Sequence, residues 1–122
     1  PTLTRRERAN RVKKRNVFSE RVVEMALSIP KGRVTTYGRL ARAAGGGAMA
    51  SQSITSILGK AEARGVKGIP YHRIVYADGR VWMSRTHRAA RLALYEKEGI
   101  KIDKDDKIID FKNKVLDPNV SP

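Results

Sequence analysis

The chain contains no cysteine, and this absence excludes several kinds of chemistry. Disulfides, thiolate nucleophiles and cysteine-based zinc sites all require a thiol. Histidine is also scarce, because His72 and His87 are the only two. We therefore expect neither a histidine metal cluster nor a cofactor. A chain without cysteine also fits a reducing cytoplasm.

Long apolar runs are missing as well. No stretch is apolar enough over sufficient length to span a bilayer, and the basic N-terminus lacks the apolar segment of a signal peptide. We predict no membrane contact. The expected location is the cytoplasm, at the nucleoid, in a prokaryote, or the nucleus in a eukaryote.

Positive charge is what the chain has in excess. Lys and Arg number 26 against 12 Asp and Glu, which gives a net charge of +14 over 122 residues. Such a balance indicates a polyanionic partner, nucleic acid first and an anionic membrane surface second. A solubility surface or a ribosome-associated protein is the alternative. Apolar residues make up 40% of the chain, which suits one globular domain.

The charge divides the chain into three parts. Residues 1–16 hold seven basic residues and one acid. This composition predicts either a basic arm that becomes ordered on DNA or a solvated tail. Residues 17–102 carry the regular apolar patterns and form the predicted domain. Residues 103–122 alternate lysine with aspartate and form a predicted tail that packs loosely over the domain. Its apolar contacts would be Ile108, Ile109, Phe111, Val115 and Leu116.

Three helices are predicted in the first half. Apolar residues recur at helical spacing over 18–29. Thr35 or Thr36 can cap a short second helix, which the glycines at 45–47 end. A third helix is expected over about 51–63.

A hairpin and a final helix follow. Asp78-Gly79 between the apolar runs 74–76 and 80–82 is a hairpin signal. A last helix should run from near residue 86 to Gly99, its expected stop. The order predicts a mainly α protein with a small β-hairpin, a single-domain winged helix-turn-helix.

The third helix has the features of a DNA-recognition helix. Ile54, Ile57, Leu58 and Ala61 form one narrow apolar stripe, and the opposite face carries small polar groups. Such a face can enter a groove closely and bond phosphates. The alternative is an ordinary amphipathic surface helix. The predicted DNA-contacting residues are Thr35, Thr36, Ser51, Ser53, Ser56 and Lys60.

Three stretches, residues 29–41, 69–74 and 96–99, resemble the DNA-binding domain of O6-alkylguanine-DNA alkyltransferases. The second, Ile-Pro-Tyr-His-Arg-Ile, is similar to the family's active-site motif Pro-Cys-His-Arg-Val. The resemblance covers about residues 17–100. It implies a helix inserted into the minor groove and a pocket for a flipped base.

The motif departs from the family at one position. The resemblance places Tyr71 where the family has its reactive cysteine, and the chain has no other thiol. A phenol has a pKa near 10 and is a poorer nucleophile than a thiolate. The chain is thus similar to the non-catalytic alkyltransferase-like proteins, which usually carry tryptophan there. That resemblance implies a protein, not an enzyme, that recognises and flips O6-alkylguanine and marks it for nucleotide excision repair.

The resemblance also assigns roles around this motif. His72 and Glu98 match the pair that activates the thiol, and here they are expected to be a hydrogen-bonded structural remnant. Arg73 either bridges the pocket to DNA or pairs internally. The alternative for Tyr71, His72 and Glu98 is an acid–base set of an enzyme, an uncommon constellation without a metal or cofactor.

Base flipping is assigned to two residues. Tyr37 matches the tyrosine that rotates the target phosphate, although simple core packing is the alternative. Gln52 is nearest to the family's intercalating arginine, with Met49 as a possible helper. The predicted lesion pocket consists of Tyr71, Trp82, Met83, Ser84 and Arg85, with Trp82 either stacking on the base or closing the core.

The expected partners are double-stranded DNA, preferably alkylated, and nucleotide excision repair proteins, with the chain as a monomer. Two alternatives bind DNA differently. A winged-helix transcription regulator would prefer an operator and ignore lesions. A non-specific coating protein would bind normal and alkylated duplexes equally.

Overall fold

Helices dominate the described chain, which comprises residues 4–47 and 49–118, with the backbone alone described for 7–16. In this computed structural model the elements are α1 (Arg5–Leu27), β1 (Thr35–Thr36), α2 (Tyr37–Ala43), the 3-10 turn η1 (Ala50–Ser53), α3 (Ile54–Ala63), the 3-10 turn η2 (Tyr71–Arg73), β2 (Ile74–Val75), α4 (Arg88–Lys97) and α5 (Phe111–Lys114). The predicted mainly helical, single-domain fold with a small sheet is confirmed. The ends of the predicted arm and tail, 1–3 and 119–122, lie outside the described residues.

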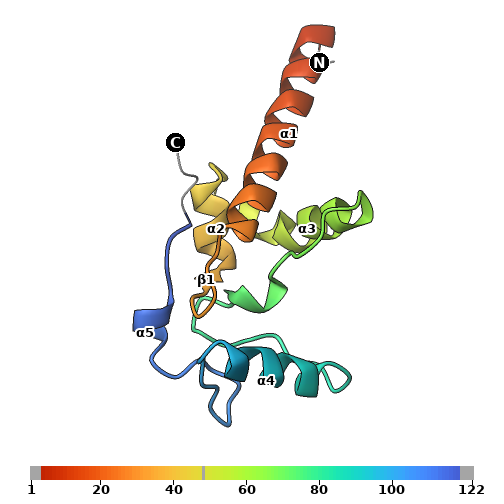
Figure 1. Ribbon diagram of the computed structural model, residues 1–122. Helices are drawn as coiled ribbons and strands as arrows, with labels where there is room; N and C mark the ends of the chain where they lie inside the picture. The colour runs from red at the N-terminus through yellow and green to blue at the C-terminus, as the bar shows by residue number, and fades with distance from the viewer. Residues whose placement is uncertain (1–3, 48, 119–122) are drawn as a thin grey trace.

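Helix α1 is longer than its apolar pattern predicts. It begins at Arg5, so the backbone of the predicted basic arm is helical and continuous with the apolar segment. Figure 1 shows the N-terminal part of α1 extending away from the rest of the chain. Val22, Met25 and Ala26 are buried against α2 and α3, so the expected face of the second half forms the core contact. Even this helix lacks the apolar length to cross a bilayer, as does every other helix described.

The helix-turn-helix unit follows the predicted order. The Thr36 hydroxyl accepts a hydrogen bond from the Arg39 amide at 3.1 Å and so caps α2, as the sequence indicated. Leu40 of α2 and Leu58 of α3 are buried in the same core as α1. The third helix starts with the 3-10 turn η1 before α3 proper.

The turn between α2 and η1 depends on a close approach at Gly46. A Cβ there would lie 2.4 Å from the Ala50 Cβ and 2.7 Å from the Phe18 ring. Gly47 beside it has nothing within 4 Å. We expect Gly46→Ala to lower the free energy of unfolding by about 1–3 kcal/mol, because the extra methyl overpacks the α1–α2 contact. Gly47→Ala is the matched control; equal urea midpoints for both variants would refute the close-packing argument.

The small sheet differs from the predicted hairpin. Strand β1 pairs in parallel with β2, with Thr35 opposite Ile74 and Thr36 opposite Val75. All four residues are buried, so both strands lie in the interior. Apolar runs on either side of Asp-Gly indicate a turn. They do not indicate that the first run pairs with β1, a strand distant in the sequence.

The turn itself is present where the sequence placed it. The Gly79 amide donates to the Tyr76 carbonyl at 2.9 Å, and the Tyr76 amide donates to Arg80. The run 80–82 then leaves the predicted partner, because the Val81 amide donates to the Asp106 carbonyl at 2.8 Å. The hairpin prediction was therefore right about the turn and wrong about the strand pairing.

The C-terminal segment is bound more firmly than predicted. The Val34 amide donates to the Lys114 carbonyl at 3.0 Å, and the Leu116 amide donates to the Val34 carbonyl at 2.8 Å. The Thr35 hydroxyl donates to the Leu116 carbonyl at 2.9 Å. Ile108 is buried, whereas Ile109 is 48% exposed and does not pack as expected. The tail thus lies along the open side of β1. The division into arm, domain and tail stays a prediction.

Candidate nucleic-acid interface

A cavity of about 370 Å³ lies between α2, α3, β2 and α4. This volume is within the range of about 300–1,000 Å³ typical of small-molecule sites. The walls are mostly aromatic and aliphatic. The residues that line it are Tyr37, Thr55, Leu58, Tyr71, Ile74, Tyr76, Trp82 and Arg91.

Two tyrosines form one wall. Tyr37 is the first residue of α2, directly after the capping threonine, which fixes its backbone. Its ring centroid lies 5.8 Å from that of Tyr76. Burial and the neighbouring Tyr76 raise the pKa of Tyr37, although hydrogen bonding to Thr55 opposes the shift. Tyr37 therefore stays a neutral phenol that can donate a hydrogen bond.

Tyr71 lines the cavity and leaves its volume open. It starts the η2 turn after Pro70 and is half-buried. Burial, together with the negative charge of the nearby Glu62 on α3, raises the pKa of Tyr71.

Trp82 and Arg91 also line the cavity. The guanidinium carbon of Arg91 lies 5.2 Å from the centre of the Trp82 ring. The His87 ring lies 5.8 Å from the same indole. Trp82 is 41% exposed, so it borders the cavity rather than closing the core.

The other three predicted pocket residues do not line this cavity. Met83 packs against the second core cluster. Ser84 hydrogen-bonds to His87, with its Oγ 2.8 Å from Nδ1, in the turn before α4. Arg85 is exposed outside the cavity. The expected loop wall is wrong because residues 84–87 form a turn that directs the chain into α4.

The sequence analysis assigned no site role to three of the lining residues, namely Thr55, Tyr76 and Arg91. Arg91 lies on α4, and it reaches the cavity only through the packing of that helix. Tyr76 directly follows β2, and its place depends on the parallel pairing that the sequence did not indicate.

Next to Tyr71 in the chain lies a partly buried ionic cluster. Arg73 donates from Nε and Nη2 to the two Glu98 carboxylate oxygens, at 3.0 Å each, and from Nη1 to the Ile29 carbonyl. The His72 Nε2 lies 2.5 Å from Glu98 Oε2, so the predicted hydrogen bond is present. Arg73 thus pairs internally and is not on the surface. The expectation that it contacts DNA loses its basis.

Glu98 is held in its ionised form. Burial would raise the pKa of Glu98, but hydrogen bonds from Arg73, the Gly32 amide and His72 outweigh burial and lower it to about 2. Its side chain is 6% exposed. The cluster joins the C-terminal end of α4, the η2 turn and the loop after α1.

The predicted DNA-contacting residues differ in exposure. Thr35 and Thr36 are buried, with hydroxyls bound to Leu116 and Arg39, so the surface role predicted for them is wrong. Ser51 is half-buried. The exposed members are Ser53, Ser56 and Lys60, and they lie on η1 and α3 together with the exposed Gln52, which was predicted for base flipping.

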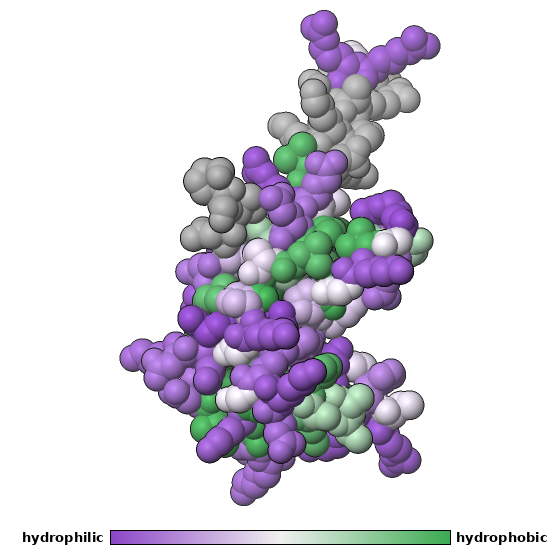
Figure 2. Space-filling model, in the orientation of Figure 1, coloured by the Kyte–Doolittle hydropathy of each residue, from purple (hydrophilic) through white to green (hydrophobic). Residues whose placement is uncertain are grey.

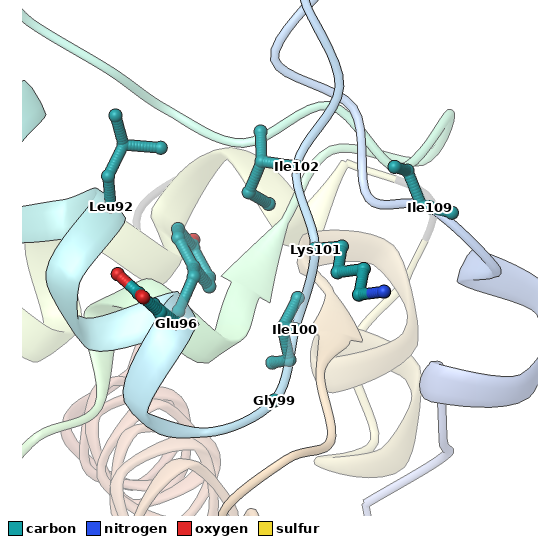
Figure 3. Close-up of a pocket in the computed structure, with 8 residues that line it drawn as sticks. Leu92, Glu96, Gly99, Ile100, Lys101, Ile102 and Ile109 are labelled. Carbon is teal, nitrogen blue, oxygen red and sulfur yellow. The ribbon is translucent and has the colours of Figure 1, made fainter.

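A second, more open cavity of about 490 Å³ lies at the end of α4. Figure 3 shows aliphatic side chains around it, among them Leu92, Ile102 and Ile109. Glu96 and Lys101 are its charged members. Within the described ranges, no three acidic or histidine side chains lie close enough to hold a metal ion.

Hydrophilic side chains cover most of the face in Figure 2, and smaller apolar areas appear over α3 and near α4. With a net charge of +14, this surface suits a polyanion.

Comparison with known proteins agrees with this geometry. The family described as "6-O-methylguanine DNA methyltransferase, DNA binding domain" matches residues 17–100. Among solved structures, the chain is similar to S. pombe Atl1 in complex with damaged DNA containing O6-carboxymethylguanine, with a TM-score of 0.62 and 19% identity. The match covers 84% of this chain and 97% of that one, and at this identity it shows a common fold. A search of curated proteins finds no significant match.

Proposed function

Because the chain belongs to the family of 6-O-methylguanine DNA methyltransferase DNA-binding domains, we propose that it binds duplex DNA and holds an everted, alkylated guanine without repairing it. The observation that carries this proposal is the aromatic cavity of about 370 Å³ beside the exposed face of α3. A purine can stack there between aromatic rings.

The absence of a thiol sets the chemistry of the proposed complex. Alkyl transfer in this family needs a cysteine in the motif where this chain has Tyr71, and the chain has none. The raised pKa of Tyr71 keeps its phenol protonated at neutral pH and further from a nucleophile. The bound base therefore leaves unchanged.

The first proposed event is the electrostatic attraction of duplex DNA. The basic surface attracts duplex DNA with a strong dependence on salt. The exposed face of η1 and α3 enters a groove, and Gln52 fills the space that the everted base leaves. Tyr37 assists eversion, which costs a few kcal/mol and less for a mispaired base. The persistent complex of one protein molecule with the lesion then signals to nucleotide excision repair. The resemblance to alkyltransferase-like proteins, including Atl1 on damaged DNA, supports this role.

The test is a binding titration at several fixed salt concentrations with two duplexes of one sequence, one carrying O6-methylguanine. We expect tighter binding of the modified duplex, and a fluorescent base opposite or beside the lesion should brighten on unstacking. Trp82→Ala should reduce the preference about 5- to 100-fold, because base–aromatic stacking contributes about 1–3 kcal/mol.

Leu94→Ala is the matched control, since Leu94 is a 40% exposed apolar residue of α4 outside the cavity. It should keep the wild-type preference. Equal affinity of the wild-type protein for both duplexes, with no fluorescence change, would reject lesion recognition and favour a coating protein. A preference that follows sequence instead would favour a transcription regulator.

A further inference from the structure

Arg91 is the charged residue among those that line the aromatic cavity. Ion pairs among the described side chains involve Arg39, His72, Arg73 and Arg88, and Arg91 has no carboxylate within 4.0 Å. Glu62 lies near Tyr71 and does not line the cavity. A cation beside apolar walls with no carboxylate partner can still form an ion pair with an anionic ligand.

The position of Arg91 is set by two neighbours. Its guanidinium lies over the Trp82 ring, at 5.2 Å from the centroid. It also lies close to the Tyr95 hydroxyl, which donates to the His72 carbonyl at 2.5 Å. A guanidinium whose face is covered by an indole still has N–H donors along its edge. The side chain is therefore held in place with donors free for a planar anion.

We propose that Arg91 makes the cavity selective for guanines whose O6 substituent carries a negative charge, a carboxylate above all. This inference rests on the proposed function, because it needs the base to enter the cavity. A carboxylate can accept two parallel hydrogen bonds from the guanidinium edge, whereas an alkyl group or a neutral amide cannot match the charge.

The preference can be measured with adducts of nearly equal size. Duplexes of one sequence would carry unmodified guanine, O6-methylguanine, O6-carboxymethylguanine, or its neutral carboxamide counterpart. We expect the wild-type protein to bind the carboxylate about tenfold more tightly than the carboxamide, the effect of one charge-assisted hydrogen bond. The difference should narrow as salt rises.

Arg91→Gln should bring the ratio of carboxylate to carboxamide affinity close to one and keep the preference for O6-methylguanine over guanine. Lys97→Gln is the matched control, because it removes one positive charge from an exposed position on the same helix, outside the cavity. This control should weaken all duplexes slightly and keep the ratio.

The other anion near a flipped base is a DNA phosphate. If Arg91 binds phosphate, Arg91→Gln will weaken all four duplexes alike and reduce the slope of log affinity against log salt by about 1. That result overturns the inference. Equal wild-type binding of carboxylate and carboxamide, with O6-methylguanine still preferred over guanine, also overturns it and leaves the proposed function standing. If no adduct is preferred over guanine, the proposed function itself fails.

Discussion

Replacing Glu98 with alanine should lower the free energy of unfolding by about 3–5 kcal/mol, because it leaves a buried cation without its partner. Arg73 is 14% exposed and donates two hydrogen bonds to this carboxylate. The same change removes an acceptor from His72 and from the Gly32 amide. Urea unfolding followed by circular dichroism measures the loss.

Glu96→Ala is the matched control for this prediction. Glu96 is an exposed glutamate of the same helix, and its replacement should change stability by less than about 0.5 kcal/mol. Glu98→Gln should fall between the two, since its amide oxygen can still accept one hydrogen bond from Arg73. If Glu98→Ala unfolds at the same urea concentration as Glu96→Ala, the cluster does not stabilise the fold as argued.

Acid should destabilise the wild-type protein through the same carboxylate. The pKa of Glu98 is lowered from 4.5 to about 2 in the folded state, so the unfolded chain takes up this proton more readily as pH falls. The contribution of Glu98 is fully present above its unfolded pKa and is lost as pH falls through its folded pKa. We expect about 3 kcal/mol of stability to disappear between about pH 5 and 2 from this group.

Other carboxylates also titrate in this window, so the comparison with Glu98→Gln isolates the effect. The stability difference between the wild-type protein and this variant should shrink as pH falls. A difference that stays constant from pH 5 to 2 would show that Glu98 has an ordinary pKa in the folded protein.

The helical part of the fold could be predicted because its signals are local. The spacing of Val22, Met25 and Ala26, the cap at Thr36 and the stop at Gly99 each depend on neighbours within a turn or two. Gly99 has the positive φ of +75° expected of a helix stop. The start of α1 was missed because residues 5–16 carry no apolar periodicity, and a polar helix resembles a solvated arm in sequence.

The sheet could not be predicted in the same way. Which segment lies beside Ile74 and Val75 depends on a strand from the first third of the chain, and the local pattern favoured a hairpin instead. In the site, too, some residues have local sequence signals and others depend on distant packing. The motif located Tyr71, His72 and Glu98, whereas Arg91 and Tyr76 reach the cavity only through the packing of α4 and β2.

The contacts of β1 have consequences for the rate of folding. Thr35 binds Leu116, 81 residues further along the chain, so the last neighbour of β1 arrives from the far end of the sequence. Closing so long a loop carries an entropic cost that local helix formation does not. High contact order slows folding, and helices form in about a microsecond or less. We therefore expect the capture of the C-terminal segment, and not helix formation, to set the folding rate.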